Sequence, residues 1–542
     1  MRLIIDGQPL QNANSRDSGI GRYTSNFLSS LAQLPENHEI ILALRSDLLP
    51  WNNSHTKIKT LFYTPPTINP SNLDADHMRC EHQYAKWISQ HSPDVYINTD
   101  NMNPWFLVPR FGIIKPITAS IYYDLIPLLF PDIYLYDINA VNFHAIRLRS
   151  LLKNDLIFSI SEQSSKDLAH FFPEAKDKLL TIYGAMDPCF SHESKPETNS
   201  TWIDLQSKLN LDKPYFFHVG RWEPRKNLEG AIEGFACFNL KYPNQYNLVI
   251  NCTLKPDQFI SLNTLASQFN VQHQLRITGR TNDHELKLLY KNARLLFFPS
   301  FYEGLGLPIL ESLASGTPVA VSRTSSMPEF AGPDAGLFDP SNPQDMATCL
   351  EKMLAIPKES LSESGKAFAN SFSWAKITAK SIDAIESLIA NPKKPLRISS
   401  LVRLWPILSE NDTQLTVNLI SQLKLEFSVR HFISTAEKFF PQDLINLAPI
   451  QSWDDLGLSL LEDPSQVLIC WPRSAAELAL FKAIDFSEKY LILDEVNRNF
   501  FCSGSSFETR NKTADNFVFN GFKGVMEMNN RNEIIFIHLN QY

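Results

Sequence analysis

Two glutamates, Glu303 and Glu311, lie eight positions apart on either side of a Gly-x-Gly turn in the stretch 298–311. An apolar run at 293–299 leads into this stretch and predicts a buried strand. Pro308 has a φ fixed near that of a first helical turn, so a helix is expected to begin beside it. Both carboxylates then fall near a helix N-terminus, whose unpaired amides and partial positive charge suit a phosphate. An ordinary strand–turn–helix with surface acids is the alternative for this stretch alone.

A second loop, at 220–227, follows an apolar run and carries Arg221 and Lys226 five positions apart. A forked guanidinium together with the point charge of an ammonium is a common pairing for a diphosphate. The alternative is a solvated charge cluster, since Glu223 could pair with Arg225. The two loops in one α/β region predict a site for a phosphorylated ligand.

These loops are accompanied by a Gly-Thr-Pro-Val turn at 316–319 and a Pro-Glu pair at 328–329. The set resembles the motifs of glycosyltransferase family 4, over about residues 1–392. The resemblance implies an α/β protein of the GT-B fold, with two Rossmann-like doubly wound domains facing each other across a cleft. It also implies a retaining, metal-independent transfer of a hexose from a nucleotide sugar.

By this resemblance Arg221, Lys226 and Glu303 are the catalytic residues, with the two cations stabilising the departing diphosphate and Glu303 contacting the donor sugar. A role for Glu303 as nucleophile or general base is the open alternative. Glu311 is expected to accept hydrogen bonds from the ribose hydroxyls. The other donor-binding residues that the resemblance implies lie in glycine-containing loops: Gly19, Gly21, Gly279, Arg280, Gly304, Leu305, Gly306 and Leu307.

One position departs from the family pattern. Most members carry His-Asp-Leu after the strand expected at 117–121, whereas this chain has Tyr123 and Asp124 there, followed by leucine. A tyrosine hydroxyl can donate a hydrogen bond but does not readily move a proton near neutral pH. Tyr123 and Asp124 are therefore expected to contact the sugar or the acceptor, and a turn cap is the alternative for Asp124.

The composition is that of an ordinary globular chain of 542 residues, long enough for several domains. A net charge of −8 argues against a nucleic-acid partner. The seven cysteines are scattered without metal-ligand spacing, which favours a reducing compartment. The stretch 1–10 predicts a strand rather than a signal peptide, and no apolar run is long enough for a transmembrane helix. An Asp-x-Asp match at 74–76 lies in a polar segment, so no metal is expected.

The alternation of apolar runs with helical patterns predicts parallel βαβ units in three domains. The expected order is an N-terminal Rossmann-like acceptor domain at 1–200, a donor domain at 201–392 whose last helix crosses back, and a small additional α/β domain at 393–542. The last of these could be a degenerate copy of the first domain. It lacks a second Glu-x7-Glu pair, so we do not expect it to be catalytic.

The resemblance points most closely to mannosyltransferases, so GDP-mannose is the expected donor. A growing glycan or lipid-linked saccharide of surface polysaccharide or lipopolysaccharide is the expected acceptor. The expected location is the cytoplasm. The basic, apolar pattern at 141–153 is also that of an interfacial helix in peripheral contact with the inner face of the cytoplasmic membrane, although such a helix is more often a domain face. The rival function is a non-catalytic sugar-nucleotide sensor or scaffold.

Overall fold

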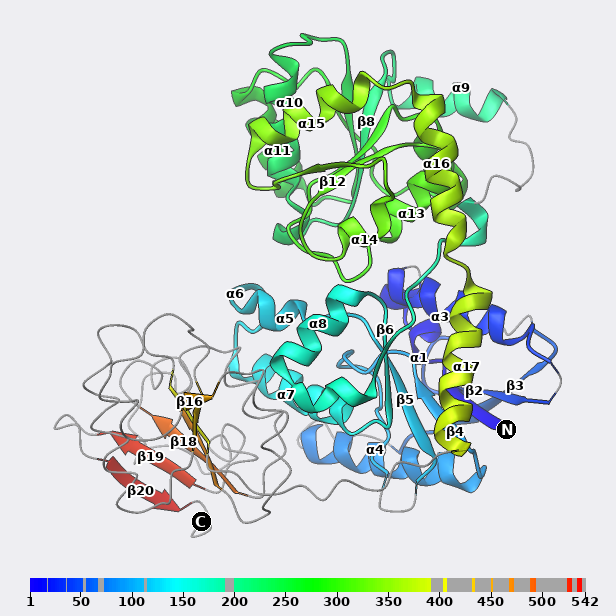
Figure 1. The fold of residues 1–542 in the computed structure, drawn as a ribbon, viewed down its shortest axis with the longest axis vertical. Helices are drawn as coiled ribbons and strands as arrows, with labels where there is room; N and C mark the ends of the chain where they lie inside the picture. The colour runs from blue at the N-terminus through cyan, green and yellow to red at the C-terminus, as the bar shows by residue number, and fades with distance from the viewer. Residues whose placement is uncertain are drawn as a thin grey trace.

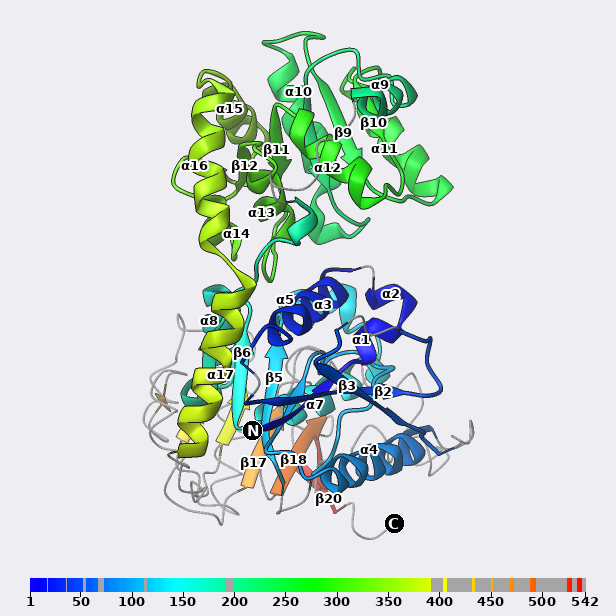
Figure 2. The ribbon, with the colours of Figure 1, turned by 90° about the vertical axis from the view of Figure 1, so that its right-hand side faces the viewer.

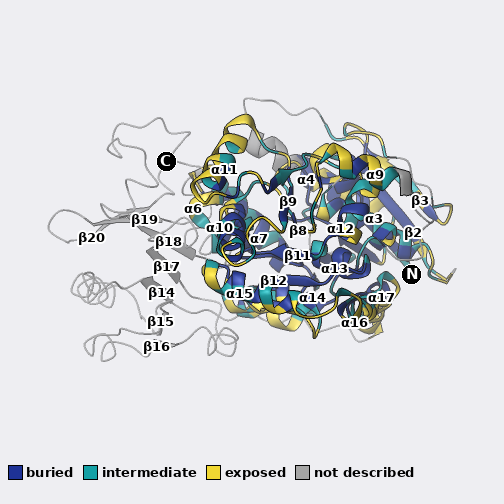
Figure 3. Ribbon diagram, turned by 90° about the horizontal axis from the view of Figure 1, so that it is seen from above, coloured by how far each residue is buried: buried dark blue, intermediate teal, exposed yellow. Residues whose placement is uncertain are grey.

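The computed structural model describes residues 1–390 apart from 17, 36, 52–54, 67–72, 112–114 and 191–198, and beyond residue 390 it describes seven strands. Residues 1–390 form two α/β domains stacked along the long axis of the molecule (Figure 1). Buried residues concentrate on the sheets and on the inner faces of the helices that cover them (Figure 3).

The first domain is built on a parallel sheet in the order β3-β2-β1-β4-β5-β6-β7. Its strands are β1 Arg2–Asp6, β2 Glu39–Arg45, β3 Ile58–Tyr63, β4 Val95–Asn98, β5 Ile117–Tyr122, β6 Leu156–Ser159 and β7 Leu179–Thr181. Five of these coincide with apolar runs. The other two, β3 and β7, lie at the two edges, where only part of each strand is buried and the apolar signal is weak.

The α-helices of this domain are α1 Gln8–Gln11, α2 Ala13–Arg16, α3 Gly19–Leu31, α4 Leu73–Gln90, α5 Ile126–Leu129, α6 Pro131–Tyr134, α7 Ile138–Leu152 and α8 Glu162–Phe171. Gly19 and Gly21 were expected in a donor-binding loop, but α3 begins at Gly19, so both glycines lie in its first turn. A Cβ on Gly21 would lie 2.3 Å from the Ser15 carbonyl oxygen. Glycine is needed there because α3 packs tightly against α2, which corrects the expectation of an open loop.

The second domain has a parallel sheet in the order β10-β9-β8-β11-β12-β13. Its strands are β8 Tyr215–Val219, β9 Asn247–Asn251, β10 Leu275–Ile277, β11 Leu295–Phe298, β12 Val319–Ser322 and β13 Gly336–Phe338. Its helices are α9 Asn199–Lys208, α10 Leu228–Asn239, α11 Pro256–Gln268, α12 Asp283–Asn292, α13 Leu307–Ala314, α14 Met327–Ala331, α15 Pro343–Leu354 and α16 Lys358–Ser371. The strand predicted from the apolar run at 293–299 is present as β11, and the short strand β13 lies at one edge of the sheet.

The final helix, α17 Trp374–Ala390, returns to the first domain as expected and runs along it (Figures 1 and 2). Its Thr378 hydroxyl lies 2.7 Å from the Ser30 hydroxyl of α3. Lys380 Nζ donates to the Thr181 carbonyl at 2.7 Å, at the end of β7. The two domains are therefore joined by two crossings of the chain.

The third sheet has the strand order β16-β15-β14-β17-β18-β19-β20. These strands are β14 Arg403–Pro406, β15 His431–Ile433, β16 Ile450–Gln451, β17 Val467–Trp471, β18 Glu488–Leu493, β19 Gly524–Met528 and β20 Ile534–His538. Counted from its own first strand, the order equals that of the first domain, except that β20 runs antiparallel. The second domain has the same order through its six strands, so the interpretation of the third domain as a degenerate copy of the first stays a prediction. The domain boundaries near 200 and 392 stay predictions, and residues 391–402, which surround the second boundary, lie outside the described residues.

The helix considered for membrane contact, α7, is mostly buried in the first domain. Its Arg147 is 1% exposed and pairs with Glu81, with Nη1 2.6 Å from Oε1. Val141, Leu148 and Leu151 are also buried, so the helix is a domain face and the interfacial interpretation of its basic residues is not supported. Among the residues described, no helix combines the length and apolarity that crossing a membrane requires.

Candidate donor-binding site

The segment around the two glutamates folds as predicted, with β11, a loop, and then α13 with Pro308 in its first turn. Gly306 precedes the helix with φ +90°, a left-handed conformation that glycine adopts without strain. Glu303 lies in the loop and Glu311 lies inside α13, and each is 6% exposed. Both carboxylates are thus held close to the start of one helix.

Glu303 is clamped by two cations from the loop after β8. Lys226 Nζ lies 2.6 Å from Glu303 Oε1, and Arg225 Nη1 lies 2.9 Å from Oε2. Burial alone would raise the pKa of Glu303, but the two cations lower it overall. Burial lowers the pKa of Lys226, and the Glu303 charge opposes that shift. The arrangement is a buried ion-pair cluster beside the N-terminus of α13.

Asn227 explains why the loop holds this position. It adopts a left-handed conformation with φ 55° and caps α10 by accepting a hydrogen bond from the Gly230 amide at 3.2 Å. Its Nδ2 donates to the carbonyls of Pro299 and Pro340 at 3.0 and 2.9 Å. Because Pro299 directly follows β11, this side chain ties the cationic loop to the loop that carries Glu303.

Of the two cations predicted from the sequence, only Lys226 belongs to this cluster. Arg221 is exposed, and its Nη2 reaches the Asn14 carbonyl of the first domain at 3.4 Å. Arg225 was missed as a site residue, although it stands next to Lys226 in the sequence. Its pairing with Glu223 was the open alternative, and it is confirmed at 2.8 Å. The same guanidinium also contacts Glu303, which spacing along the chain could not reveal.

Glu311 lies among residues from both domains. Its Oε2 accepts a hydrogen bond from the Tyr290 hydroxyl at 2.8 Å. Burial raises the pKa of Glu311 to about 7, and the nearby Arg22 guanidinium opposes that rise. Arg22 belongs to α3 of the first domain and donates to Asp283 of the second. The sequence analysis selected the neighbouring Gly19 and Gly21 as donor-binding residues but did not select the side chain of Arg22.

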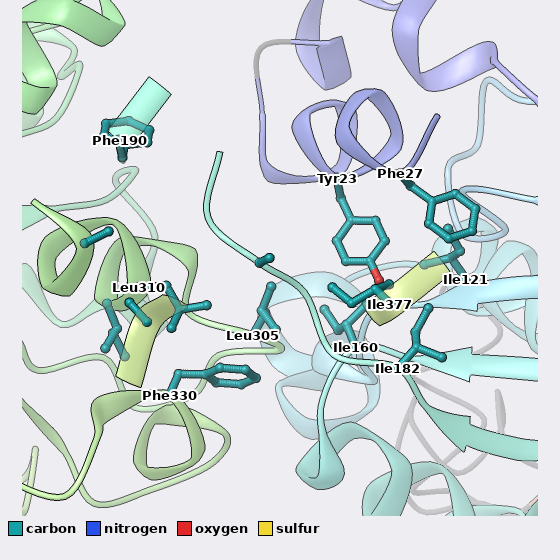
Figure 4. Packing of buried hydrophobic residues seen from close by; sticks show 14 of the residues in the cluster. Tyr23, Phe27, Ile121, Ile160, Ile182, Phe190, Leu305, Leu310, Phe330 and Ile377 are labelled. Atoms are coloured by element: carbon teal, nitrogen blue, oxygen red, sulfur yellow. The ribbon is translucent and has the colours of Figure 1, made fainter. Parts of the chain in front are cut away.

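The loop from Gly304 to Leu307 contacts the first domain. A Cβ on Gly304 would lie 2.9 Å from Asp124 Oδ2, so glycine permits this close approach. Leu305 packs against Gly184, where a Cβ would lie 2.5 Å from its Cδ2, and it lies in the core cluster shared with Tyr23 (Figure 4).

Leu307 marks a further point of contact. Its Cδ1 lies 3.8 Å from the position that a Cβ on Gly19 would occupy. The structure therefore brings Gly19, Gly304, Leu305 and Leu307 together between the domains, while Gly21 is turned toward α2.

Tyr123 and Asp124 lie at the end of β5, next to this loop. The Tyr123 hydroxyl donates to the Thr99 carbonyl at 3.0 Å, so it is directed into the first domain. Asp124 Oδ1 accepts a hydrogen bond from the Ile126 amide at 3.0 Å, which confirms the turn-cap alternative. Burial raises the pKa of Asp124, whereas its backbone hydrogen bond and the Arg225 charge oppose the rise. Asp124 thus serves as a cap and also faces Gly304.

Gly279 and Arg280 follow the edge strand β10. Gly279 has φ +70°, and a Cβ there would meet no atom within 4 Å. Asn251 Nδ2 donates to the hydroxyls of Thr278 and Thr281, each at 2.8 Å, and fixes the backbone on either side. Arg280 is exposed. This turn offers open space at the carboxyl edge of the sheet, where such sheets bind ligands.

Further polar contacts join the two domains around the site. Glu329 accepts hydrogen bonds from the amides of Glu162 and Gln163, both at 2.8 Å, at the start of α8. The Tyr134 hydroxyl lies 3.2 Å from Glu223 Oε2. Among the side chains described, no group of three or more His, Cys, Asp or Glu is arranged to hold a metal ion. The Asp-x-Asp match falls in α4, with its side chains outside those described.

Comparison with known proteins assigns this geometry to a family. Residues 202–368, nearly all of the second domain, match the family model "Glycosyl transferases group 1". The serotype-specific mannosyltransferase WbdA of Escherichia coli is 29% identical over 287 residues, which are 51% of this chain and 34% of WbdA. The O-antigen chain mannosyltransferase B of Escherichia coli is 30% identical over 243 residues, 44% of this chain and 62% of that protein.

The fold is also that of solved GT-B structures. Sucrose-phosphate synthase from Thermosynechococcus elongatus superposes with a TM-score of 0.56 at 16% identity, over 72% of this chain and 99% of that one. The chain spans about a third of the length of WbdA, so the match concerns domains rather than whole proteins. Residues 1–390 have the GT-B architecture, and within them residues 202–368 match the glycosyl transferases group 1.

Proposed function

We propose that this protein is a retaining glycosyltransferase that moves a hexose, with mannose as the first choice, from a nucleotide sugar to a growing glycan or lipid-linked saccharide. The observation that carries the proposal is the cluster of Lys226, Arg225 and Glu303 beside the N-terminus of α13, with Glu311 in the same helix. The mannosyltransferase relatives support mannose as the sugar, and the O-antigen chain relative supports surface polysaccharide or lipopolysaccharide as the product. GDP-mannose is the donor that we propose from the resemblance of the sequence motifs.

The chemistry follows from the charges. When the bond between the sugar C1 and the diphosphate oxygen breaks, positive charge develops on the sugar and negative charge on the diphosphate. Two fixed cations and a helix N-terminus stabilise the leaving group in a site with little water. The acceptor oxygen bonds to C1 on the same face, and its proton passes to the departing phosphate oxygen. Glu303 holds Arg225 and Lys226 in place before the donor arrives.

In this proposal the two cations do the work for which other transferases use a metal ion, so transfer should persist in a chelator. The reaction would take place in the cytoplasm, at the inner face of the cytoplasmic membrane where a lipid-linked acceptor is available. The free cysteines of the described region support a reducing compartment. The rival function, a non-catalytic sensor, is not favoured because Arg225, Lys226 and Glu303 are still held together by ion pairs in the site.

Calorimetric titration with GDP, UDP, ADP and their sugars tests the donor site. One nucleotide should bind preferentially, and Lys226→Ala should weaken it at least tenfold, about 1.4 kcal/mol. The matched control is Lys241→Ala, which removes an exposed lysine paired with Glu351 at 2.5 Å elsewhere in the same domain. Failure of every nucleotide to bind to folded protein would overturn the proposal.

Release of the nucleotide then separates an enzyme from a sensor. A transferase should release nucleoside diphosphate when it is given the preferred donor with alkyl and lipid-linked mannosides, and it should do so in EDTA as well. Binding of the donor without any release across that acceptor panel would favour the sensor.

A further inference from the structure

Arg22 extends from the first domain to the second. It lies in the first turn of α3, on the side of the first domain that is turned toward the second (Figure 2). Its Nη2 donates to the carboxylate of Asp283, the first residue of α12. Its guanidinium carbon lies 5.9 Å from the centre of the Phe190 ring, in the segment that links the domains. One arm of the guanidinium is therefore fixed across the interface.

The other arm lacks an acceptor. In the part of the chain that the structure describes, Arg22 Nη1 is buried from solvent and makes no hydrogen bond. A buried charged donor left without a partner costs more free energy than a neutral donor does. The structure thus holds a cationic N–H at the domain interface that has no acceptor among the residues described.

The surroundings of Arg22 indicate which acceptor is missing. The nearby carboxylates of Glu311 and Asp187 both interact with its charge. Asp187 is already engaged, since it accepts from Asn26 Nδ2 at 3.2 Å and from the Cys189 amide at 2.9 Å. Glu311 accepts from Tyr290, and no ion pair within 4.0 Å joins it to Arg22. A guanidinium and a carboxylate therefore lie near each other without direct contact.

A hydroxyl group has the chemistry to join them, because it carries one donor and two acceptor lone pairs. We propose that Arg22 Nη1 donates a hydrogen bond to a ribose hydroxyl of the bound nucleotide, which in turn donates to Glu311. The inference rests on the proposed function, in which Glu311 is the ribose carboxylate. Arg22 then places a nucleotide contact in the first domain, so the ribose is fully bound only when the domains are together.

The simpler interpretation makes Arg22 an interdomain ion pair with Asp283 and nothing more. In that case its loss would weaken domain closure, and every nucleotide would lose affinity to the same extent. In the proposed arrangement the loss depends on the ribose hydroxyls. The two interpretations therefore differ in whether a substitution of Arg22 alters the loss of affinity that follows removal of a ribose hydroxyl from the nucleotide.

The experiment is a thermodynamic cycle in which one change is a substitution of Arg22 and the other is removal of a ribose hydroxyl from the nucleotide. Calorimetry on the full chain measures the nucleotide affinity at each corner of the cycle. GDP, or the diphosphate that the wild type prefers, is compared with its 2′-deoxy and 3′-deoxy forms on wild type and on Arg22→Gln. In the wild type at least one deoxy form should bind about tenfold more weakly. In Arg22→Gln that penalty should shrink at least fivefold, because the hydroxyl has lost its donor.

Arg22→Lys is the second variant, since it keeps the positive charge and the pairing with Asp283 but loses the forked second arm. It should show the same reduced penalty. Lys208→Gln is the matched control, since it removes an exposed cation that pairs with Glu285 of the same helix at 3.4 Å. It should behave as the wild type does.

A deoxy penalty that is unchanged in both Arg22 variants would overturn the inference while leaving the proposed function intact. If the wild type bound no nucleotide at all, the proposed function itself would be contradicted.

Discussion

Lys226 Nζ lies 2.6 Å from Glu303 Oε1, and both side chains are nearly buried between the two domains. The pair comes from loops 77 positions apart in the sequence, and Asn227 fixes the first loop to the end of β11. The Glu303 carboxylate fixes the position of the Lys226 ammonium before any ligand binds. The ammonium is therefore preorganised to interact with a diphosphate.

Lys226→Ala should lower kcat/KM for the donor at least 100-fold, about 2.7 kcal/mol in transition-state stabilisation. The lost ammonium would otherwise stabilise the departing diphosphate. Lys226→Arg should recover part of the activity, since it restores charge but not shape. Steady-state release of nucleotide measures the effect, and the melting temperature verifies folding. Equal rates for Lys226→Ala and wild type would remove Lys226 from the mechanism.

Nucleotide affinity should rise with pH through the neutral range. Burial raises the pKa of Glu311 to about 7, and only the ionised carboxylate can accept from both ribose hydroxyls. A pKa near 7 leaves about a tenth of the groups ionised at pH 6 and nine tenths at pH 8, so binding should tighten up to about tenfold. Titrations at a series of pH values test this. Glu311→Gln should bind weakly with a flat profile, and a steep profile in that variant would assign the dependence to another group.

The same shift has a consequence for folding. The folded-state pKa of about 7 lies above the model value of 4.5, so the folded protein holds this proton more tightly than the unfolded chain does. The contribution of Glu311 to stability is therefore fully present below about pH 4.5 and is lost as the pH rises through about 7. Glu311→Gln should remove this part of the pH dependence of denaturant unfolding.

Gly184→Ala should distort the donor loop. The added Cβ would lie 2.5 Å from Leu305 Cδ2, closer than real contacts allow, and 3.1 Å from the Tyr23 ring, which is a tight contact. Overpacking of this kind costs about 1–3 kcal/mol, so both thermal stability and donor affinity should fall. The double variant Gly184→Ala with Leu305→Ala should regain part of the stability, because the clash is removed. Additive losses in the double variant would contradict the direct contact.

Tyr123→Phe should retain most of the activity, with less than a threefold loss in kcat. Its hydroxyl donates to the Thr99 carbonyl at 3.0 Å and so is not available as an acid or base, and burial raises its pKa well above 10. The shape of the kcat profile from pH 6 to 9 should be unchanged. Loss of one limb of that profile would show that Tyr123 moves a proton after all.

From the sequence alone, continuous apolar runs predicted parallel α/β domains, because such runs mark buried parallel strands. The GT-B arrangement of these domains was implied by the resemblance of the motifs to glycosyltransferase family 4. Glu303, Glu311 and Pro308 could be placed around one helix start because local geometry follows from neighbouring residues. The edge strands β3, β7 and β13 could not be predicted, since a short strand at a sheet edge takes part of its stability from pairing that the local sequence does not record.

Tertiary structure decided which charges meet. From spacing, Arg221 and Arg225 were equally able to join Lys226, and only the path of the loop between β8 and α10 directs Arg225 to Glu303 and Arg221 to the first domain. The proximity of Arg22 to Glu311 also depends on how two domains pack, over nearly 300 positions of chain. Long-range contacts of this kind arise from the whole fold, so single-residue patterns fix the chemistry available while the packing of the domains fixes which groups come together.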